Sequence, residues 1–294
     1  MTHAASGRLY VVATPIGNLG DLSARARATL DACSLIAAED TRRTGTLLNA
    51  FGLSKPMLSL HEHNESLRTA GLIEKLKGGA SIALVSDAGT PGINDPGFDL
   101  VRACAAAGIE IVAIPGPCAL IAALSIAGLP TDRFCFEGFL PARRAARQEH
   151  LAALALETRT LVFYEAPHRV REALEDCAES FGGERPAAVA RELTKLHETL
   201  YRGALSQLVA HAAADPAFVR GEIVLVIAGA SPAAAAAAST GADGHGGALD
   251  RVLLPLLEEL PLKQAAHLAA RIAEVRDNEA YKRALALKQA YGAR

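Results

Sequence analysis

Short apolar segments alternate with longer amphipathic segments along the first part of the chain. The apolar segments have the length and the small or β-branched side chains of buried parallel strands, and they are residues 9–13, 35–38, 57–60, 81–85 and 109–114. Helical periodicity in the segments between them is typical of a doubly wound parallel sheet. The pattern therefore predicts an N-terminal parallel-sheet α/β module over residues 8–117.

The second part of the chain has a different pattern, in which expected strands outnumber expected helices. The expected strands are residues 134–139, 160–164, 187–191, 199–202 and 221–228. Strands joined by short connections pair antiparallel, whereas parallel strands need a long crossover. Residues 118–230 are therefore predicted to form a C-terminal mixed-sheet α/β module, and the fold class is α/β with two such modules.

A low-complexity segment separates these modules from a small helical tail. Residues 231–248 contain an alanine run followed by Gly, Ser, His and Asp, which indicates a flexible linker. Residues 249–260, 262–275 and 278–290 have helical periodicity, and the tail 249–294 resembles a helix-turn-helix. Two interpretations stay open for this tail: a cap that packs on the body, and a contact with nucleic acid.

Three loops rich in glycine and proline follow predicted strands. They are residues 14–20, 86–97 and 115–118, and the second has three Gly and two Pro. The carboxyl ends of parallel strands meet at one edge of a sheet, where open α/β sheets bind ligands. Glycine allows close approach of the backbone to a ligand, and proline limits flexibility. We therefore expect these loops to converge on one binding site.

Composition narrows the class of protein. The 294 residues carry a formal net charge of −2, which excludes a broadly basic nucleic-acid coat but not a local basic patch. Five cysteines without a CxxC pair indicate core thiols of a reducing compartment. The first seven residues lack the pattern of a signal peptide, and the apolar runs are too short to span a membrane. The expectation is a soluble cytoplasmic protein.

Several common site motifs are missing from the sequence. No GxGxxG opens the first strand-to-helix turn, and neither GxxxxGK[ST] nor GxSxG occurs, which argues against dinucleotide, P-loop and serine-hydrolase chemistry. His61 and His63 stand two residues apart, but this pair without further ligands is weak for zinc, and Asn64 as a helix cap explains the polarity. We expect no metal site.

Nine motifs, taken in their order along the chain, resemble one known family. They are Thr14-Pro-Ile-Gly-Asn-Leu, Glu39-Asp-Thr-Arg, His61-Glu-His-Asn-Glu, Ser86-Asp-Ala-Gly-Thr-Pro, Asp95-Pro-Gly, Pro115-Gly-Pro, Phe136-Glu-Gly-Phe-Leu-Pro, Tyr164-Glu-Ala-Pro-His-Arg and Arg191-Glu-Leu-Thr-Lys. Together they resemble the ribosomal RNA methyltransferases of the tetrapyrrole methylase superfamily. The likeness runs from about residue 8 to residue 229 and resumes in the tail. Gly92 departs from it, since a larger apolar residue is expected there, and the linker 231–248 has no counterpart.

The resemblance implies S-adenosyl-L-methionine as cofactor, bound in a cleft between the two modules of a homodimer. The implied reaction is 2′-O-methylation of a cytidine in the decoding region of 16S rRNA, in the 30S subunit. Carried over by motif, the cofactor-binding residues are Pro15, Gly17, Asp87, Ala88, Gly89, Thr90, Pro91, Pro115, Gly116, Pro117, Ala119, Glu192 and Leu193. Adenine is expected near the last two of these and the last strand.

Such a reaction needs a group that removes the proton of a ribose hydroxyl. The candidates are Glu39, Asp40, Glu165, His168 and Lys195, and each could equally be part of a structural ion pair. For contacts to RNA phosphates, arginine forks are the best choice. The candidates are Arg42, Arg143, Arg144, Arg147 and Arg169, with a solvated helix face as the other interpretation of the turn at 143–147.

Two other functions compete with this one. The first is a methyltransferase of the same fold that acts on a corrin-type tetrapyrrole, which would need neither the basic turn nor the helical tail. The second is a non-catalytic RNA-binding or assembly protein, which would have no affinity for the cofactor. The intact Gly/Pro loops argue against this second function.

Overall fold

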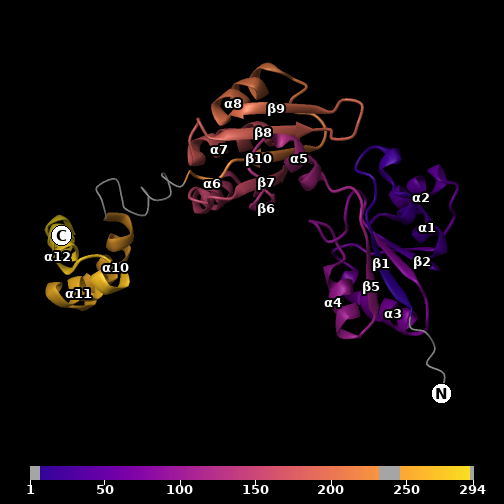
Figure 1. The fold of residues 1–294 in the computed structure, drawn as a ribbon, viewed down its shortest axis with the longest axis horizontal. Helices are drawn as coiled ribbons and strands as arrows, with labels where there is room; N and C mark the ends of the chain where they lie inside the picture. Colours follow the sequence, from indigo (N-terminus) through magenta and orange to yellow (C-terminus); the bar gives the residue numbers. More distant parts are fainter. Residues whose placement is uncertain (1–6, 232–245, 292–294) are drawn as a thin grey trace.

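The computed structural model describes residues 7–231 and 246–291 of the chain. Two five-stranded sheets, each covered by helices, follow one another in sequence, and a group of three helices forms the tail (Figure 1). This architecture confirms the predicted α/β fold with two modules and a helical end. Among the described residues, no helix is both long and apolar enough to cross a membrane.

The first sheet is parallel throughout and has the order β3-β2-β4-β1-β5. Its strands are β1 (Arg8–Val12), β2 (Leu35–Ala38), β3 (Met57–Ser59), β4 (Ile82–Val85) and β5 (Glu110–Ile114). The connecting helices are α1 (Ala24–Ala32), α2 (Thr41–Ala50), α3 (Glu65–Lys77) and α4 (Phe98–Ala106), with a short 3₁₀ turn η1 (Leu19–Asp21). Strands β1, β4 and β5, which precede the three Gly/Pro loops, lie side by side.

Helices cover both faces of this sheet, as the doubly wound prediction requires. Alternate residues of β4 point to opposite faces, so Leu84 packs with Leu72 of α3 and Leu100 of α4. On the other face, Val85 packs with Leu30 of α1 and other apolar side chains of α1 and α2. All four residues of β4 are buried, which explains why this strand is continuously apolar.

The second sheet is mixed and has the order β6-β7-β10-β8-β9. Its strands are β6 (Phe134–Phe139), β7 (Thr160–Glu165), β8 (Pro186–Arg191), β9 (Thr199–Ala204) and β10 (Ile223–Ile227), and its helices are α5 (Ala119–Ala127), α6 (Arg144–Leu154), α7 (Val170–Phe181) and α8 (Leu205–Ala214). Only β6 and β7 pair parallel, and the other three pairs are antiparallel. The expected mixed sheet is thus confirmed.

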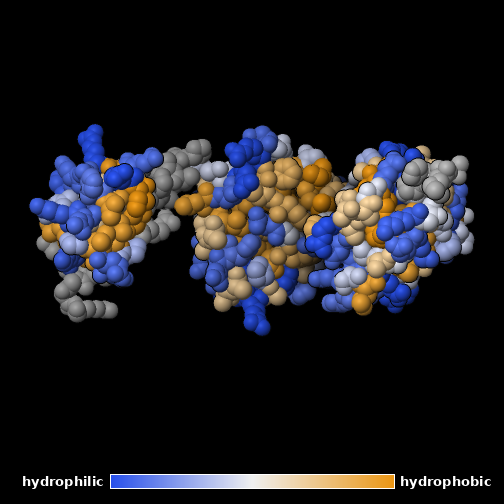
Figure 2. Space-filling view, turned by 90° about the horizontal axis from the view of Figure 1, so that it is seen from below, coloured by the Kyte–Doolittle hydropathy of each residue, from blue (hydrophilic) through white to orange (hydrophobic). Residues whose placement is uncertain are grey.

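Helix α5 packs on one face of this sheet through small and apolar side chains. Leu120, Ala123 and Leu124 contact Val162 of β7 and Val226 of β10 within one buried cluster. The opposite side of α5 remains open to solvent. Figure 2 shows a broad hydrophobic area on the middle part of the molecule, which is the part built on this second sheet.

The basic first turn of α6 departs from one of our expectations. Arg147, a candidate for RNA contact, is 0% exposed. Its Nε lies 2.7 Å from Asp176 of α7, and a second nitrogen lies 3.3 Å from Glu172. A guanidinium shielded from water and paired with a buried carboxylate joins α6 to α7 and is not available to a phosphate. The prediction for Arg147 is wrong.

The tail forms a separate small core. Its helices are α10 (Gly246–Glu259), α11 (Leu262–Ile272) and α12 (Asp277–Tyr291). Leu249, Leu253, Ala266, Ala269 and Leu287 are among the buried residues that hold them together. Helix α10 begins at Gly246, three residues before the start at residue 249 that the sequence predicted. Most of the predicted linker, residues 232–245, lies outside the described residues.

Candidate active site between the two sheets

The three Gly/Pro loops do converge beyond the carboxyl edge of the first sheet. Thr14 and Gly89 exchange two backbone hydrogen bonds, of 2.8 and 3.0 Å, which pair the loops after β1 and β4. The hydroxyl of Thr90 donates to the carbonyl of Pro117 at 3.0 Å, which adds the loop after β5. Gly89 has a φ of 82°, a backbone conformation that favours glycine.

The second sheet turns its own strand ends toward the same space. Because β10 runs antiparallel to β7 and β8, Ile223 at its start pairs with Glu165 and with Arg191 at their ends. The residues that follow β7 and β8 therefore lie beside the start of β10. Two loop residues there, Glu192 and Thr194, have positive φ values of 52° and 66°, which is costly for residues with a Cβ.

A cleft of about 450 Å³ lies between these two sets of loops. Of the predicted site residues, it is lined by Glu39, Asp87, Ala88, Gly89, Thr90, Ala119, Glu165 and Leu193. Residues from both modules thus share one cavity, within the size range of small-molecule sites.

Other predicted residues lie around the cleft without lining it. Those from the first module and its last loop are Pro15, Gly17, Asp40, Pro91, Pro115, Gly116 and Pro117, and those from the second module are His168, Glu192 and Lys195. Lys195 covers Gly17, where an added Cβ would collide with its side chain. Glu192 and Lys195 also hold the lining residue Glu222, whose backbone and carboxylate they bind.

Several lining residues were not among the predicted site residues, although most of them lie in the Gly/Pro loops or in the last strand, where the site was expected. They are Ile16, Arg43, Ile93, Asn94, Asp95, Cys118, Phe139, Tyr164, Ala166, Pro167, Gly221, Glu222, Ile223 and Val224. A signal was present for Phe139 and Tyr164, since both stand at the carboxyl ends of predicted strands. Their rings pack with centroids 5.7 Å apart.

Two of the cleft carboxylates fix the local backbone. Glu39 accepts a hydrogen bond from the backbone N–H of Asp87 at 3.1 Å. In return, Asp87 accepts one from the N–H of Asp40 at 3.0 Å, and Arg43 lies 3.3 Å from the same carboxylate. These reciprocal bonds hold the ends of β2 and β4 together, so both acids have a structural task at the rim of the cleft.

Glu165 is the most deeply buried acid of the cleft, with a side chain that is 0% exposed. One oxygen accepts from the N–H of Ala166 at 2.7 Å and pairs with Arg169 at 2.7 Å. The other oxygen is buried and has no hydrogen-bond partner among the described residues. Buried polar groups are normally paired, so this orphaned oxygen indicates a place for a ligand donor.

The remaining candidate bases are engaged elsewhere or lie outside. Asp40 caps α2, and its hydrogen bonds with Arg42 hold the pKa of this carboxyl well below its usual range. Burial lowers the pKa of Lys195, but its bonds to Glu192 and Glu222 outweigh this, so the amine stays protonated. His168 is exposed and does not line the cleft.

Two further cleft residues have shifted pKa values. Burial, together with the charges of Glu39 and Asp87, raises the pKa of Asp95 to about 6, although a hydrogen bond with Ser86 opposes the shift. Burial also raises the pKa of Tyr164, whose hydroxyl accepts from the N–H of Leu120 at 3.2 Å. The phenol therefore stays protonated at neutral pH.

The candidate RNA-contacting arginines fall into two groups. Arg42 has an 89% exposed side chain and Arg144 a 63% exposed one, although each also pairs with an acid, and Arg143 is exposed. Arg169 is mostly buried and forms an ion pair with Glu165. Within residues 7–231 and 246–291, no group of three or more His, Cys, Asp or Glu side chains could hold a metal ion.

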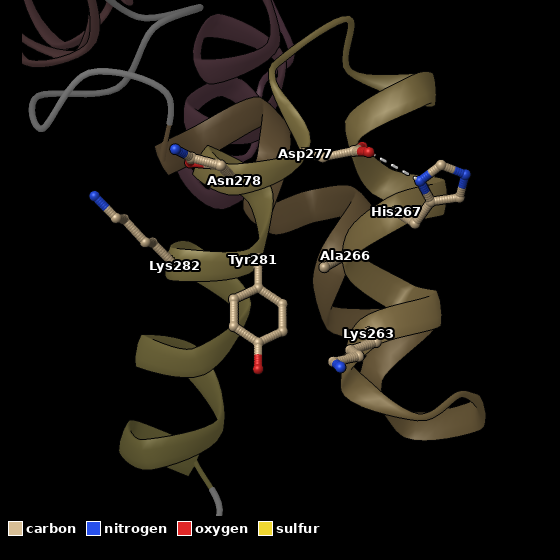
Figure 3. Close-up of a pocket in the computed structure, with 7 residues that line it drawn as sticks. All are labelled: Lys263, Ala266, His267, Asp277, Asn278, Tyr281 and Lys282. Carbon is tan, nitrogen blue, oxygen red and sulfur yellow. Dashed lines mark hydrogen bonds and ion pairs between the residues drawn. The ribbon is translucent and has the colours of Figure 1, made fainter.

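A second hollow lies between α11 and α12 of the tail and has a volume of about 580 Å³ (Figure 3). Tyr281 projects from α12 into the space in front of α11, with Lys263 across from it. His267 and Asp277 bridge the two helices at 3.1 Å. The lining side chains except Ala266 are exposed, and the ion pairs of the described residues include neither Lys263 nor Lys282.

Comparisons with known proteins agree on one family. Residues 8–209 match the tetrapyrrole (corrin/porphyrin) methylases, and residues 243–288 match the RsmI C-terminal HTH domain. Ribosomal RNA small subunit methyltransferase I of Pseudomonas aeruginosa is 52% identical over 281 residues, which cover 96% of this chain and 98% of that protein. The protein of the same name from Escherichia coli O157:H7 is 50% identical over 96% of both chains.

Solved structures show the same fold. The methyltransferase CobJ superposes with a TM-score of 0.57 at 22% identity, covering 76% of this chain and 95% of that one. A uroporphyrin-III-C-methyltransferase from Thermus thermophilus superposes with a TM-score of 0.53 at 22% identity, covering 76% and 94%. The cleft between two α/β modules, the motifs that line it and these matches lead to one conclusion: the chain belongs to the tetrapyrrole (corrin/porphyrin) methylase family.

Proposed function

We propose that this chain transfers a methyl group from S-adenosylmethionine to the 2′-oxygen of a cytidine ribose in the decoding region of 16S rRNA. One observation carries the proposal: relatives named ribosomal RNA small subunit methyltransferase I are about half identical to the chain over nearly its whole length, tail included. The solved structures of the fold are too distant to decide the substrate.

S-adenosylmethionine is the cofactor of this family, and the residues of the cleft fit it. The lining carboxylates Asp87, Asp95 and Glu165 suit a cofactor that carries a sulfonium charge. The orphaned oxygen of Glu165 can accept a hydrogen bond from the bound molecule. Apolar lining residues of the second module, Leu193 and Ile223 among them, offer a surface for the adenine ring.

The bound cofactor would supply an already activated methyl group, so the task of the protein is alignment and proton removal. The paired loops at Thr14 and Gly89 hold the backbone around the cleft in one arrangement, which favours alignment. A ribose hydroxyl is a weak nucleophile at neutral pH, and a positioned base accelerates such a step by roughly 10²–10⁴-fold. The acidic lining of the cleft supplies groups of this kind.

The RNA would approach over exposed basic side chains. Arg42, Arg143 and Arg144 remain accessible for phosphate contacts near the two modules. In the tail, Lys263 and Lys282 flank the exposed ring of Tyr281. Aromatic rings stack on unpaired RNA bases, and lysines neutralise phosphates, so the tail hollow suits a single-stranded RNA segment.

We further propose a homodimer in the cytoplasm, where ribosomal RNA is found. Helix α5 leaves Ile121 50% and Ile126 37% exposed on its open side, which favours a partner at this surface. Sedimentation of the purified protein tests the dimer, and Ile121→Asp should shift it toward the monomer.

The test is transfer of labelled methyl from S-adenosylmethionine to 30S subunits purified from cells that lack this protein, followed by mapping of the modified nucleoside. A 2′-O-methylcytidine at one position is the expected result. Cofactor binding without transfer to subunits or to naked 16S RNA would overturn the proposal. Methylation of a corrin-type tetrapyrrole by the same preparation would then establish the competing function.

A further inference from the structure

Glu65 is the last residue of the motif His61-Glu-His-Asn-Glu and does not line the cleft. It is the first residue of α3 and is only 6% exposed. One oxygen of its carboxylate accepts a hydrogen bond from the N–H of Gly97 at 3.1 Å, and the other accepts from the N–H of Leu100 at 3.0 Å. Both oxygens therefore bind the backbone at the start of α4, which comes 32 to 35 residues later in the chain.

These two hydrogen bonds make Glu65 the cap of a helix to which it does not belong. The first N–H groups of a helix have no partner within the helix, and a side chain at the N-cap usually accepts from one of them. Gly97 is the N-cap of α4 and has no side chain to offer, and Leu100 is the third residue of the helix. The carboxylate of Glu65 takes the place of the missing cap, and it interacts favourably with the dipole of α4.

The backbone at Gly97 explains why α4 does not carry its own capping side chain. Gly97 has a φ of 126°, a conformation that favours glycine. A Cβ at this position would lie 2.7 Å from the side chain of Leu84, which is part of the core of the first module. Ser, Asp or Asn would therefore be strained here and would collide with β4. The cap has to come from another element, and α3, which packs on the same face of the sheet, supplies it.

The capped helix start is also the end of a loop that lines the cleft. The loop connects β4 to α4, and the residues of its second half that line the cavity are Ile93, Asn94 and Asp95. Its first half, residues 87–90, is joined to the neighbouring loops by the hydrogen bonds described above. Asn94 has a φ of 61°, which a residue with a Cβ adopts only where its surroundings hold it. The bonds of Glu65 fix the loop directly after this strained residue.

We propose that Glu65 is a positioning residue for cofactor binding: by capping α4 from α3, it holds residues 93–95 in the arrangement that binds S-adenosylmethionine. The inference rests on the proposed function only for the place of the cofactor in the cleft, and it needs no particular methyl acceptor. Without the cap, the start of α4 loses two hydrogen bonds and the loop before it gains freedom. Part of the binding free energy is then consumed in ordering this loop, so affinity falls.

The test compares two variants of Glu65 with a matched control. Glu65→Gln keeps the size of the side chain but replaces one accepting oxygen by an NH₂ group, which cannot accept from a backbone N–H. Glu65→Asp keeps the carboxylate and shortens its reach by one carbon. Ser23→Ala is the control, because it also removes a side-chain cap, namely the bond from the N–H of Ala26 at the start of α1. Helix α1 packs on the opposite face of the same sheet.

Three quantities are measured: the affinity for S-adenosylhomocysteine by calorimetry, amide hydrogen exchange at Gly97 and Leu100 by NMR, and the melting temperature. Glu65→Gln should weaken binding about tenfold and speed exchange at one or both amides about tenfold or more. Glu65→Asp should lie between this variant and the wild type in both measurements. Ser23→Ala should lower the melting temperature by about 2–4 °C but leave the affinity within about twofold of the wild type.

Two results would overturn the inference while the proposed function stands. In the first, Glu65→Gln speeds exchange at the start of α4 but binds S-adenosylhomocysteine within about twofold of the wild type. In the second, Ser23→Ala weakens binding as much as Glu65→Gln does, so that lost stability alone explains the effect. If Glu65→Gln does not fold, Glu65→Asp decides by the same criteria. A wild-type protein that binds the cofactor but methylates no ribosomal RNA would overturn the proposed function and leave the role of Glu65 intact.

Discussion

The cleft between the sheets and the hollow in the tail differ in a way that their volumes do not reveal. The tail hollow is the larger, at about 580 against 450 Å³. The cleft, however, contains a carboxylate with a fully buried side chain, whereas the paired side chains of His267 and Asp277 at the tail hollow are both more than half exposed. Charge shielded from water, rather than empty space, distinguishes a site for chemistry from a surface for contact.

The two regions owe this difference to the elements that build them. Loops at strand ends come from both modules and surround the cleft on several sides, so side chains there lose much of their water. The tail hollow lies between the flanks of two helices, whose long polar side chains reach solvent. The following four predictions test the contrast, in order of decreasing effect.

The largest effect is expected on stability. Glu165→Gln removes one charge of a buried pair and leaves Arg169 without its counter-ion. We expect a loss of about 3 kcal/mol in the free energy of unfolding, measured by urea titration at pH 7. A loss below about 1 kcal/mol would contradict the view that the cleft is electrostatically shielded.

The tail should respond in RNA affinity instead. Replacing Lys263 and Lys282 together by Ala should weaken binding to 16S RNA about tenfold. The slope of log affinity against log salt concentration should become less steep by about two. The affinity for S-adenosylmethionine should not change. Lys75→Ala with Lys77→Ala, in α3 of the first module, is the control pair. Equal effects of both pairs would show that the tail hollow has no special role.

The third prediction concerns the pH dependence of stability. An unfolded Asp loses its proton near pH 4, but Asp95 in the folded protein does so at about 6. Between these values the folded state holds more protons, so this group stabilises the protein below pH 4 and the contribution is lost as the pH rises through 6. Because Asp95 is partly exposed, we expect a change of only about 1 kcal/mol.

The measurement compares unfolding of the wild type and of Asp95→Asn at pH 4.5 and pH 7. Groups away from Asp95 are the same in both proteins, so the difference reports on Asp95 together with its charge interactions with Glu39 and Asp87. Between pH 4.5 and pH 7, the free energy of unfolding of the wild type should fall by about 1 kcal/mol relative to that of the variant. An identical pH dependence in both proteins would mean that Asp95 titrates as it does in water.

The smallest effect is expected for the contact between His267 and Asp277 at the tail hollow. His267 and Asp277 have side chains that are 58% and 66% exposed. Asp277→Asn should therefore change the free energy of unfolding by less than about 0.5 kcal/mol. Thermal unfolding of the full chain is the measurement. A larger loss would show that charges in this hollow are shielded from water, as they are in the cleft.

Much of the fold follows from local patterns in the sequence. The apolar run that became β4 and the Gly/Pro loop after it predicted both a buried strand and its position at the ligand edge. Because strands β1, β4 and β5 all run parallel, their loops had to meet, and the bonds between Thr14 and Gly89 confirm that they do.

The errors have a common physical cause, which is distance in sequence. The spacing of Arg143, Arg144 and Arg147 is that of a solvated helix face. The neighbouring sequence gives no sign that Arg147 pairs in the core with Asp176, which comes 29 residues later. Likewise, Asp95 before Pro96 has the pattern of a turn at the start of a helix. Its chemical environment depends on Glu39, which comes from another strand.

The pair of backbone hydrogen bonds between the loops at Thr14 and Gly89 has a consequence for the rate at which a ligand binds to the site. Their two backbone hydrogen bonds join the carboxyl-side loops of β1 and β4 directly to each other. Little backbone has to be ordered when a molecule enters, and association then approaches the diffusional rate for an open site. Differences in affinity between cofactor and product should therefore lie mainly in their residence times.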